Sequence, residues 1–476
     1  MHFSNHIDIY SSLTTLDGVV FLAVFVATFF AVAIGKKMEK QGGVVEYLLM
    51  GRQLTFPLFV ATLVSSWYGG IFPVTQLAFE NGISTFITQG VFWYVSYLLF
   101  ALILAKRVWE TQSITLAELV SKEFGPKSGK LAAIFNFFDV LPIQYVLSLG
   151  LLLQLLFGGS LIFMMCIGAF AVAIYTMVGG FRAVVFSDFI QFFVMCLSVF
   201  MVLAFSLLNF GVEVLYEKLD TSHFQISFDP KFWMWGFIAL STLVDPCFYQ
   251  RCFAAKSYKV ARKGILASIV IWILFDICTV GGAMYAKALI PNANSNQAYL
   301  IYACQILPSG VRGFVLAGIF ATILSTLDSY LFISGTTISY DASPKKWKGK
   351  ICFHKISILF VAFLSIFVGY FFQGNVKLVW KLFGSYAAAC FLFPVLFGFI
   401  FPKRISDNNF VFSSLLGAFI MTFYPNLLGE DLERFYVGLF CVTLSLTFSL
   451  FTSMGKDVLL QIRMKGRSYL LDKLKL

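Results

Sequence analysis

Charge is scarce in this sequence of 476 residues. Asp, Glu, Lys and Arg make up 12% of it, whereas soluble domains carry about 25%. A soluble fold of this length could not cover its surface with so few charges, so the composition excludes cytosolic enzymes and nucleic-acid-binding proteins. The nine cysteines form no C-x-x-C pair, which excludes a zinc module and a disulfide scaffold. What remains is a membrane protein.

Long apolar segments fill most of the chain, and 59% of all residues are hydrophobic. The hydrocarbon core of a bilayer is about 30 Å thick and requires roughly 20 apolar residues per helix. We therefore expect an all-α polytopic membrane protein with about 13 transmembrane helices, no soluble domain and no enzymatic activity. The expected spans are residues 16–35, 56–80, 83–105, 131–156, 159–178, 183–207, 231–250, 264–288, 311–338, 354–372, 378–401, 410–425 and 434–452.

The 35 Lys and Arg residues are distributed unevenly between the loops. Most of them fall in one set of alternating loops and in the C-terminal tail, and the positive-inside rule places that set in the cytoplasm. We therefore expect the N-terminus outside and the C-terminus in the cytoplasm of a bacterial inner membrane. The same assignment puts Arg182 in a short cytoplasmic turn and Arg251 in a loop. No Lys or Arg is then expected deep in a span.

Two of the expected spans carry helix-breaking residues near the middle. The span at 56–80 has two glycines and a proline around Gly69, and the span at 231–250 is interrupted at Pro246. Broken backbone at membrane depth survives only where it lines a cavity, and its free ends are then available to bind ions and solute. Because each broken span opens a run of five, the pattern predicts an inverted five-plus-five repeat, with two ordinary proline kinks as the alternative.

This repeat divides the chain into four expected parts. They are residues 1–55, an extra helix and a cytoplasmic loop; 56–207, the first five-helix repeat; 231–401, the second, inverted repeat; and 402–476, two C-terminal helices with a basic cytoplasmic tail.

A stripe of hydroxyl groups runs along the span at 311–338. Thr322, Ser325, Thr326 and Ser329 are spaced to share one face of a helix. Hydroxyl and carbonyl oxygens with few acids suit Na⁺ better than Mg²⁺ or Ca²⁺, which recruit several carboxylates or waters. Packing between helices is the alternative role for such a stripe.

All ionisable side chains expected inside the spans are acids. Such groups are costly in a membrane, so each is a candidate functional residue. The alternative is that each acid caps a helix end or bonds a neighbouring helix, and the roles of Asp139 and Asp276 stay open. The acids are Asp139, Asp188, Asp245, Asp276 and Asp328.

Several segments between residues 46 and 341 resemble the sodium:solute symporter family, and they occur in the family's order. The resemblance implies a leucine-transporter-like fold with one extra helix before the repeats and two after them. The matching segments are Glu46–Arg52, Thr115–Leu119, Tyr175–Val185 with Ser187, Asp188 and Gln191, Gln250–Lys256, and Arg312–Gly318 with Ser325–Ser329 and Asp341.

The resemblance also implies a sodium site. Its ligands are the backbone carbonyls of Ser65, Tyr68 and Thr322 and the hydroxyls of Ser325 and Thr326, which agrees with the hydroxyl stripe.

Some family members bind a second sodium ion beside the acid that matches Asp188. Here one of the family's hydroxyl positions is Asp328, with Ser329 next to it. These three residues form a second candidate cation site.

The candidate substrate residues are Trp67, Phe72, Trp93 and Asp245. Aromatic rings stand where sugar-transporting relatives carry polar residues, so sugar is disfavoured. An acid beside an indole ring suits an ammonium group. The expected substrates are therefore an amine, a quaternary ammonium compound or an amino acid.

The expected function is symport of Na⁺ and a small organic solute by alternating access, with no nucleic-acid partner. The alternatives are a proton-coupled symporter that uses Asp188 and Asp328, and a membrane sensor that transports nothing.

Overall fold

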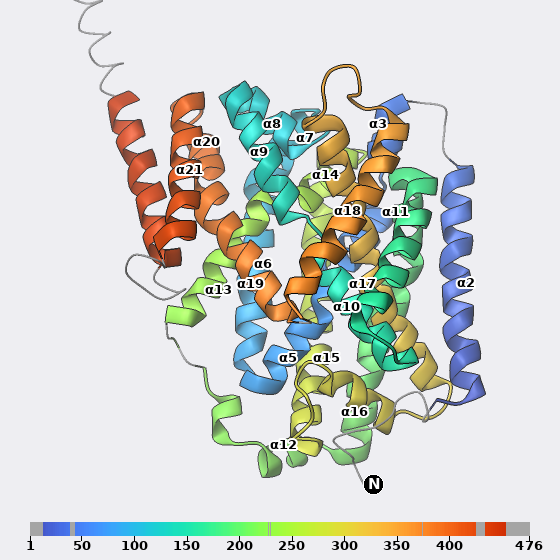
Figure 1. Ribbon diagram of the computed structural model, residues 1–476. Coiled ribbons are helices and arrows are strands. Elements are labelled where there is room, and N and C mark those ends of the chain that lie inside the picture. Colours follow the sequence, from blue (N-terminus) through green and yellow to red (C-terminus); the bar gives the residue numbers. More distant parts are fainter. Residues whose placement is uncertain are drawn as a thin grey trace, which may run out of the picture.

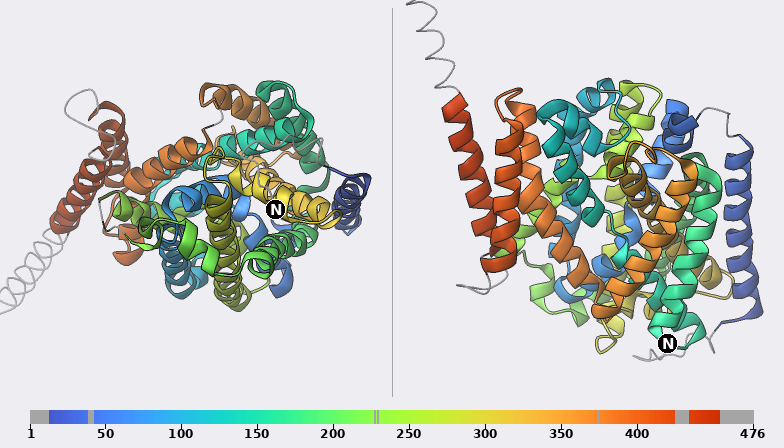
Figure 2. Two further views of the ribbon diagram at one scale, coloured as in Figure 1. Left: turned by 90° about the horizontal axis from the view of Figure 1, so that it is seen from below. Right: turned by 45° about the horizontal axis from the view of Figure 1, so that its top comes forward.

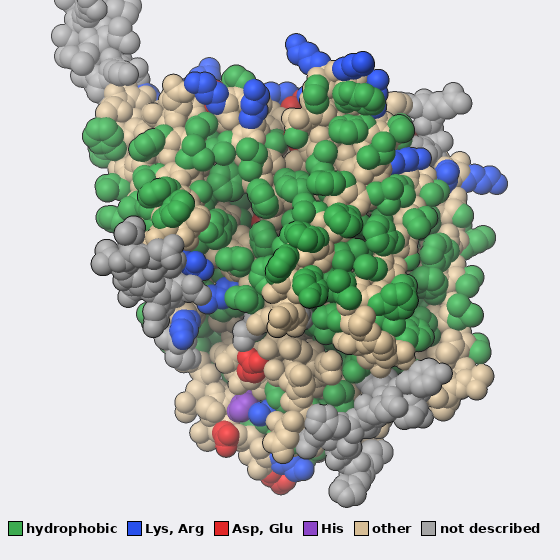
Figure 3. Space-filling view, viewed as in Figure 1, with side chains coloured by type: hydrophobic (Ala, Val, Ile, Leu, Met, Phe, Trp, Pro, Cys, Tyr) green, Lys and Arg blue, Asp and Glu red, His purple; other side chains and the backbone are tan. Residues whose placement is uncertain are grey.

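The computed structural model describes residues 13–38, 43–226, 228, 230–373, 375–424 and 434–453. In this part of the chain the helices stand side by side in one bundle (Figure 1). Hydrophobic side chains cover the broad middle of the bundle, and Lys and Arg side chains gather along its top edge (Figure 3). This distribution is that of a membrane-spanning helical bundle.

Ten helices in the described part of the chain are long and apolar enough to cross a membrane. One of them, α11 (Leu161–Phe210), has 50 residues, or about 75 Å of helix at 1.5 Å per residue, and covers two of the expected spans. The expected spans at 231–250 and 410–425 correspond to shorter helical pieces. The expected total of thirteen is therefore not confirmed and stays a prediction.

The helices of the first half follow one another with short connections. They are α2 (Thr15–Lys37), α3 (Gly43–Leu49), η1 (Met50–Arg52), α4 (Phe56–Ser65), η2 (Tyr68–Gly70), α5 (Ile71–Asn81), η3 (Phe86–Val91), α6 (Phe92–Leu99), η4 (Phe100–Leu104), α7 (Ala105–Glu110), α8 (Leu116–Phe124), α9 (Pro126–Asp139), α10 (Ile143–Phe157) and α11.

The second half begins with two short helices, α12 (Glu213–Lys218) and η5 (Thr221–Phe224). They are followed by α13 (Pro230–Leu240), η6 (Ser241–Val244), α14 (Pro246–Ala254), α15 (Tyr258–Leu289), α16 (Ala298–Ile306), α17 (Val311–Thr336), η7 (Thr337–Asp341), α18 (Ile351–Phe371), α19 (Val376–Tyr386), η8 (Ala387–Leu392), α20 (Phe393–Ile400), α21 (Asp407–Phe423) and the helix Arg434–Ser453.

Both expected breaks are present. Helix α4 ends at Ser65, one 3₁₀ turn η2 follows, and α5 resumes the span at Ile71. In the second broken span, η6 leads to Asp245, whose backbone is extended, and Pro246 begins α14. The first N–H group of a helix has no acceptor within the helix, so proline, which lacks an N–H group, costs no hydrogen bond at that position. Pro246 therefore favours the start of a new helix at this break.

Helix α11 is kinked at Gly180, where the backbone adopts a φ of +60°. A Cβ atom there would lie 2.8 Å from Cδ2 of Tyr47, so a side chain would be strained as well as crowded. Arg182 follows within the helix, buried, and its Nη2 donates to Oε1 of Glu46 at 2.6 Å. This ion pair fixes α3 against the kink.

The helices outside the expected repeats flank the bundle on opposite sides, α2 at one side and α21 with Arg434–Ser453 at the other (Figure 2). Helix α2 is also tied to α17. Oδ1 of Asp17 accepts from the backbone N–H groups of Gly310, at 2.7 Å, and Gly313, at 2.9 Å. These N–H groups belong to the start of α17, where helices lack internal acceptors.

Candidate functional site

Helix α17 passes the first break very closely. A Cβ atom on Gly69 would lie 2.5 Å from Cβ of Thr326, so only glycine fits there. Oγ1 of Thr326 donates to the carbonyl oxygens of Ser65, at 3.3 Å, and Thr322, at 3.0 Å. The broken end of α4 and the hydroxyl stripe of α17 therefore meet at one buried point.

The candidate sodium ligands lie around this point. The side chains of Ser65, Thr322, Ser325 and Thr326 are fully buried, and Tyr68 stands in the η2 turn of the same break. The hydroxyl of Tyr68 lies 3.3 Å from Oγ1 of Thr279 on α15. The oxygens that the hydrogen bonds bring together are the Thr326 hydroxyl and the carbonyls of Ser65 and Thr322, and oxygen ligands of this kind suit a small hard cation.

Asp188 on α11 organises these hydroxyl groups. Its Oδ1 accepts from Oγ of Ser325 at 2.5 Å, and its Oδ2 accepts a short hydrogen bond from Thr62. A hydroxyl group that donates its hydrogen bond to a carboxylate keeps the lone pairs of its oxygen available for another partner. The hydrogen bond to Asp188 therefore leaves the lone pairs of the Ser325 oxygen available to a further partner.

Arg251 lies in the same cluster, fully buried. Its Nη2 donates to Oγ of Ser329 at 2.8 Å and to Oγ1 of Thr62 at 3.3 Å, and lies 3.9 Å from Oδ2 of Asp188. The expectation that Arg251 lies in a loop is wrong. Helix α14 continues past residue 250 to Ala254, and the charge is tolerated because Asp188 faces it.

Asp328 is oriented differently from the other members of the second candidate cation site. Its Oδ2 accepts from the hydroxyl of Tyr175 at 2.7 Å, while its buried Oδ1 has no hydrogen-bond partner among the described residues. Asp188 and Ser329, by contrast, are bridged by Arg251. The structure therefore places a guanidinium between two of the three residues.

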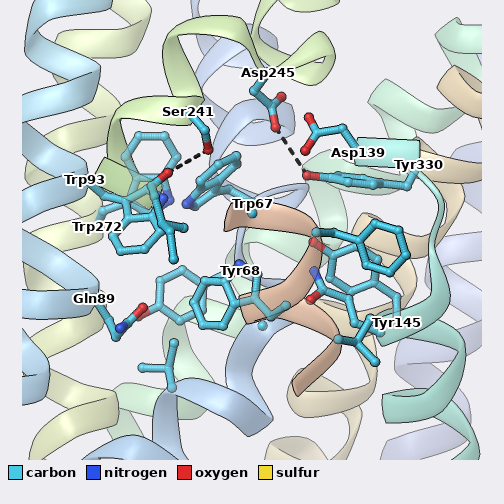
Figure 4. A pocket seen from close by; sticks show the side chains of 18 of the residues that line it. Trp67, Tyr68, Gln89, Trp93, Asp139, Tyr145, Ser241, Asp245, Trp272 and Tyr330 are labelled. Atoms are coloured by element: carbon cyan, nitrogen blue, oxygen red, sulfur yellow. Dashed lines mark hydrogen bonds between the residues drawn. The ribbon is translucent and has the colours of Figure 1, made fainter. Parts of the chain in front are cut away.

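A cavity with about 1010 Å³ of empty space, including the part open to solvent, lies between the two broken spans (Figure 4). Of the candidate substrate residues, Trp67, Trp93 and Asp245 line it. Phe72 is buried and does not line it. The lining residues are Trp67, Tyr68, Gly70, Val74, Gln89, Trp93, Tyr94, Tyr97, Asp139, Leu141, Gln144, Tyr145, Ile238, Ser241, Asp245, Trp272, Asp276, Tyr330, Val379, Trp380, Phe383 and Gly384.

The charged groups that line this cavity are all acids. Asp139, Asp245 and Asp276 reach it, and the described lining residues include no Lys, Arg or His. Within the described chain, no group of three His, Cys, Asp or Glu side chains is arranged to hold a metal ion. The described wall of the cavity therefore combines carboxyl groups with aromatic rings and carries no basic side chain.

Asp245 has two roles, one for each oxygen. Its Oδ1 accepts from the backbone N–H groups of Cys247, at 2.7 Å, and Phe248, at 3.1 Å, and so caps α14. Its Oδ2 faces the hydroxyl of Tyr330 at 3.4 Å, beside Asp139 in Figure 4. Capping of a helix end, the alternative to a functional role for this acid, therefore accounts for Oδ1 but not for Oδ2.

The sequence did not single out two polar side chains of the cavity, Gln89 and Trp272. Both side-chain amide atoms of Gln89 and the indole nitrogen of Trp272 are buried without a partner in the described chain. Gln89 belongs to the π-helical segment η3, a geometry that often marks functional positions. Trp93 on α6 and Trp380 on α19 lie with ring centroids 5.7 Å apart, and both line the cavity.

The chain belongs to the sodium:solute symporter family, whose model matches residues 47–417. It is 26% identical over 428 residues to the sodium/pantothenate symporter of Haemophilus influenzae, covering 80% of this chain and 85% of that one. It is 26% identical over 387 residues to the sodium/glucose cotransporter of Vibrio parahaemolyticus, covering 69% of each.

Solved structures support the same fold. A Na⁺-coupled sialic acid symporter in a substrate-bound outward-open state matches with a TM-score of 0.76 at 16% identity, over 92% of this chain and 98% of that one. Mhp1 in its inward-facing conformation matches with a TM-score of 0.53 at 14% identity, over 88% and 96%. The predicted all-α, leucine-transporter-like fold is thereby confirmed, and the protein is a multi-pass membrane protein.

Proposed function

We propose that this protein couples inward flow of Na⁺ to uptake of an organic solute that carries an ammonium group. The observation that carries the solute class is the cavity itself, which combines three carboxylates with aromatic walls and has no basic side chain among its described lining residues. A buried ammonium group gains from both carboxylate charge and aromatic faces. A carboxylate substrate would find no cationic partner there.

Sodium binds, in this proposal, between the first break and α17. The carbonyls of Ser65, Tyr68 and Thr322 and the hydroxyls of Ser325 and Thr326 supply the ligands. The convergence of Thr326 on the Ser65 carbonyl and the hydrogen bond from Ser325 to Asp188 support this assignment. Because the ion links α4 to α17, its binding stabilises one arrangement of the two elements, and solute binding to that arrangement couples the two fluxes.

The energy of one Na⁺ is sufficient for useful accumulation. Moving one charge through a membrane potential releases about 2.3 kcal/mol per 100 mV. Since about 1.4 kcal/mol corresponds to a tenfold ratio, this amounts to accumulation of the order of tens-fold.

The proposed orientation places the N-terminus outside and the C-terminus in the cytoplasm of a bacterial inner membrane. The supporting observation is the gathering of Lys and Arg along the edge of the bundle that holds α3, α8 and the end of α2 (Figures 1 and 3). Cysteines introduced at Lys348 and Thr221 test it, with exposed Cys352 replaced by Ser. Impermeant thiol reagents are expected to label the first from the cytoplasm and the second from outside, and the reverse pattern contradicts the orientation.

The deciding experiment for the function uses the purified protein in proteoliposomes. A thermal-shift screen of amines, amino acids, carboxylates and sugars, with and without Na⁺, identifies ligands because binding to the folded state raises its stability. We expect ammonium compounds to stabilise the protein more strongly in a Na⁺ buffer than in a K⁺ buffer, with choline left out of both because it is itself an ammonium compound. We also expect them to be taken up into proteoliposomes when an inward Na⁺ gradient is imposed. Stabilisation by sugars or anions alone contradicts the solute class, and uptake that follows a proton gradient contradicts sodium coupling.

A further inference from the structure

The polar groups that line the cavity differ between its two sides. Figure 4 shows Asp139, Asp245 and Tyr330 on one side and Gln89 and Trp272 on the other. The first side presents carboxyl groups, and an ionised carboxyl group only accepts hydrogen bonds. An ammonium group only donates them, so the ammonium group of the proposed solute belongs on the side of Asp139 and Asp245.

The side of Gln89 and Trp272 presents hydrogen-bond donors as well. Gln89 is 8% exposed and Trp272 is 1% exposed, and both line the cavity. The amide nitrogen and oxygen of Gln89 and the indole nitrogen of Trp272 have no hydrogen-bond partner in the described chain. An indole N–H group only donates, whereas an amide group donates through its nitrogen and accepts through its oxygen. A ligand that satisfies this side must therefore accept hydrogen bonds and also donate one.

Asp276 limits the charge of a group that binds on this side. A Cβ atom on Gly90, next to Gln89, would lie 3.2 Å from Oδ2 of Asp276, and this oxygen accepts a short hydrogen bond from the hydroxyl of Tyr94. A carboxylate on the solute would lie near this acid with no Lys, Arg or His among the described lining residues, which is unfavourable where the dielectric constant is low. An ammonium group has no lone pair with which to accept from the two donors.

We propose that the solute carries, at the end away from its ammonium group, an uncharged amide or hydroxyl group that hydrogen-bonds to Gln89 and Trp272. This inference rests on the proposed function and narrows its substrate class. The oxygen of either group has lone pairs that accept from the two donors, and its N–H or O–H group donates to the amide oxygen of Gln89. The three buried polar atoms then all have partners, which removes the cost of leaving them unpartnered.

The middle of the cavity fits the carbon chain of such a solute. The side chains of Trp67 and Tyr68 lie between the two sides in Figure 4. Aromatic walls of this kind offer apolar contact, while the few polar groups at the ends fix the orientation of a ligand. The solute is therefore expected to bind in one direction only, with its ammonium group towards Asp245.

Binding of amines that differ mainly at the far end tests the proposal. The probes are butylamine, 4-amino-1-butanol, 4-aminobutanamide and 4-aminobutanoate, with the same set one methylene shorter and one methylene longer. They are compared by thermal shift and by competition in Na⁺ buffer. At the best length, we expect the amide or the alcohol to bind at least about tenfold more tightly than the alkylamine, a difference of about 1.4 kcal/mol. We expect no such gain for the amino acid.

Two variants assign this gain to its side of the cavity. Gln89→Leu removes the amide group, and Trp272→Phe removes the N–H group but keeps an aromatic ring. We expect each variant to reduce the gain several-fold. Thr85→Val is the matched control, because the hydroxyl of Thr85 is buried and unpartnered in the described chain but lies outside the cavity. It should leave the gain unchanged.

The outcomes separate this inference from the proposed function. Equal affinities for the alkylamines and for their amide and hydroxyl counterparts at all three lengths would mean that water partners these groups, and would overturn the inference alone. A gain that both Gln89→Leu and Trp272→Phe leave intact would also overturn it, as would tightest binding of the amino acid. If no amine binds in Na⁺ buffer, the proposed solute class is wrong together with this inference.

Discussion

The Asp188 cluster and the neighbouring cavity are both buried and both acidic, yet their hydrogen bonding differs. In the cluster each oxygen of Asp188 accepts from a hydroxyl group, and a guanidinium lies close by. In the cavity the polar atoms of Gln89 and Trp272 have no partner in the described chain. This contrast is what our proposal expects: a small ion bound among fixed oxygens next to the cluster, and a larger ligand that completes the hydrogen bonds of the cavity.

The largest expected effect follows from removing an oxygen from the sodium side. Ser325→Ala and Thr326→Ala each delete a proposed ligand, and we expect either change to abolish Na⁺-dependent uptake while the protein stays folded. Measurement of ²²Na⁺ binding and of uptake against Na⁺ concentration checks this. The control is Ser365→Ala on α18, a fully buried hydroxyl that donates only within its own helix. Unchanged sodium affinity in both variants would contradict the assignment of Ser325 and Thr326 as sodium ligands.

The next effect concerns the distance between the break and α17. Gly69→Ala places a Cβ atom 2.5 Å from Cβ of Thr326, so the two elements must separate. We expect sodium affinity to fall by more than about tenfold. Gly70→Ala is the matched control, since its Cβ would meet nothing closer than Cγ of Pro73 at 3.8 Å. Equal sodium affinity for the two variants would show that the close approach does not shape the site.

A smaller effect is expected at Asp245 on the cavity side. Asp245→Asn retains an oxygen that can cap α14 but removes the charge that faces the cavity. We expect transport of a cationic solute to weaken by about tenfold, about 1.4 kcal/mol, with no change for a neutral solute and little change in sodium affinity. A parallel loss for charged and neutral solutes would mean that the cap at α14, and not the charge, is what matters.

The smallest effect is expected at Gln89. Gln89→Leu replaces buried polar atoms that lack partners, so the free energy of unfolding should stay equal or rise. Solute affinity is expected to fall several-fold, since one hydrogen bond contributes about 1 kcal/mol. Thr85→Val is the control, because its unpartnered buried hydroxyl lies outside the cavity. If both variants reduce solute affinity alike, Gln89 does not contact the ligand.

Local sequence patterns predicted the breaks and the hydroxyl stripe. Glycine and proline interrupt helices wherever they fall in the fold, and the spacing of Thr322, Ser325 and Thr326 fixes their common face. The position of Phe72 was harder to predict, because the 3₁₀ turn η2 changes the helical phase between Trp67 and α5. The expected substrate role of Phe72 therefore has no support from the cavity.

Contacts between distant segments were beyond the reach of the sequence. Arg251 and Asp188 are separated by 63 positions, and a basic residue at the edge of an apolar run reads as a loop residue. Trp272 and Trp380 are two of many aromatic residues in a chain that is 18% aromatic, so neither stands out until α15 and α19 are placed around one cavity. The hydroxyl stripe on α17, by contrast, could be predicted from the spacing of residues within one helix, without knowledge of the helices that pack against it.

The bond network of Asp17 has a mechanical consequence. Thr14 and Asp17 form a capping box at the start of α2, and Asp17 also holds the first N–H groups of α17. Helix α2, at one edge of the bundle, is thereby connected to α17, the helix that carries the hydroxyl stripe. Any tilt of α17 during transport would therefore be expected to carry α2 with it, and a spectroscopic reporter placed on α2 would detect that movement without altering the core of the bundle.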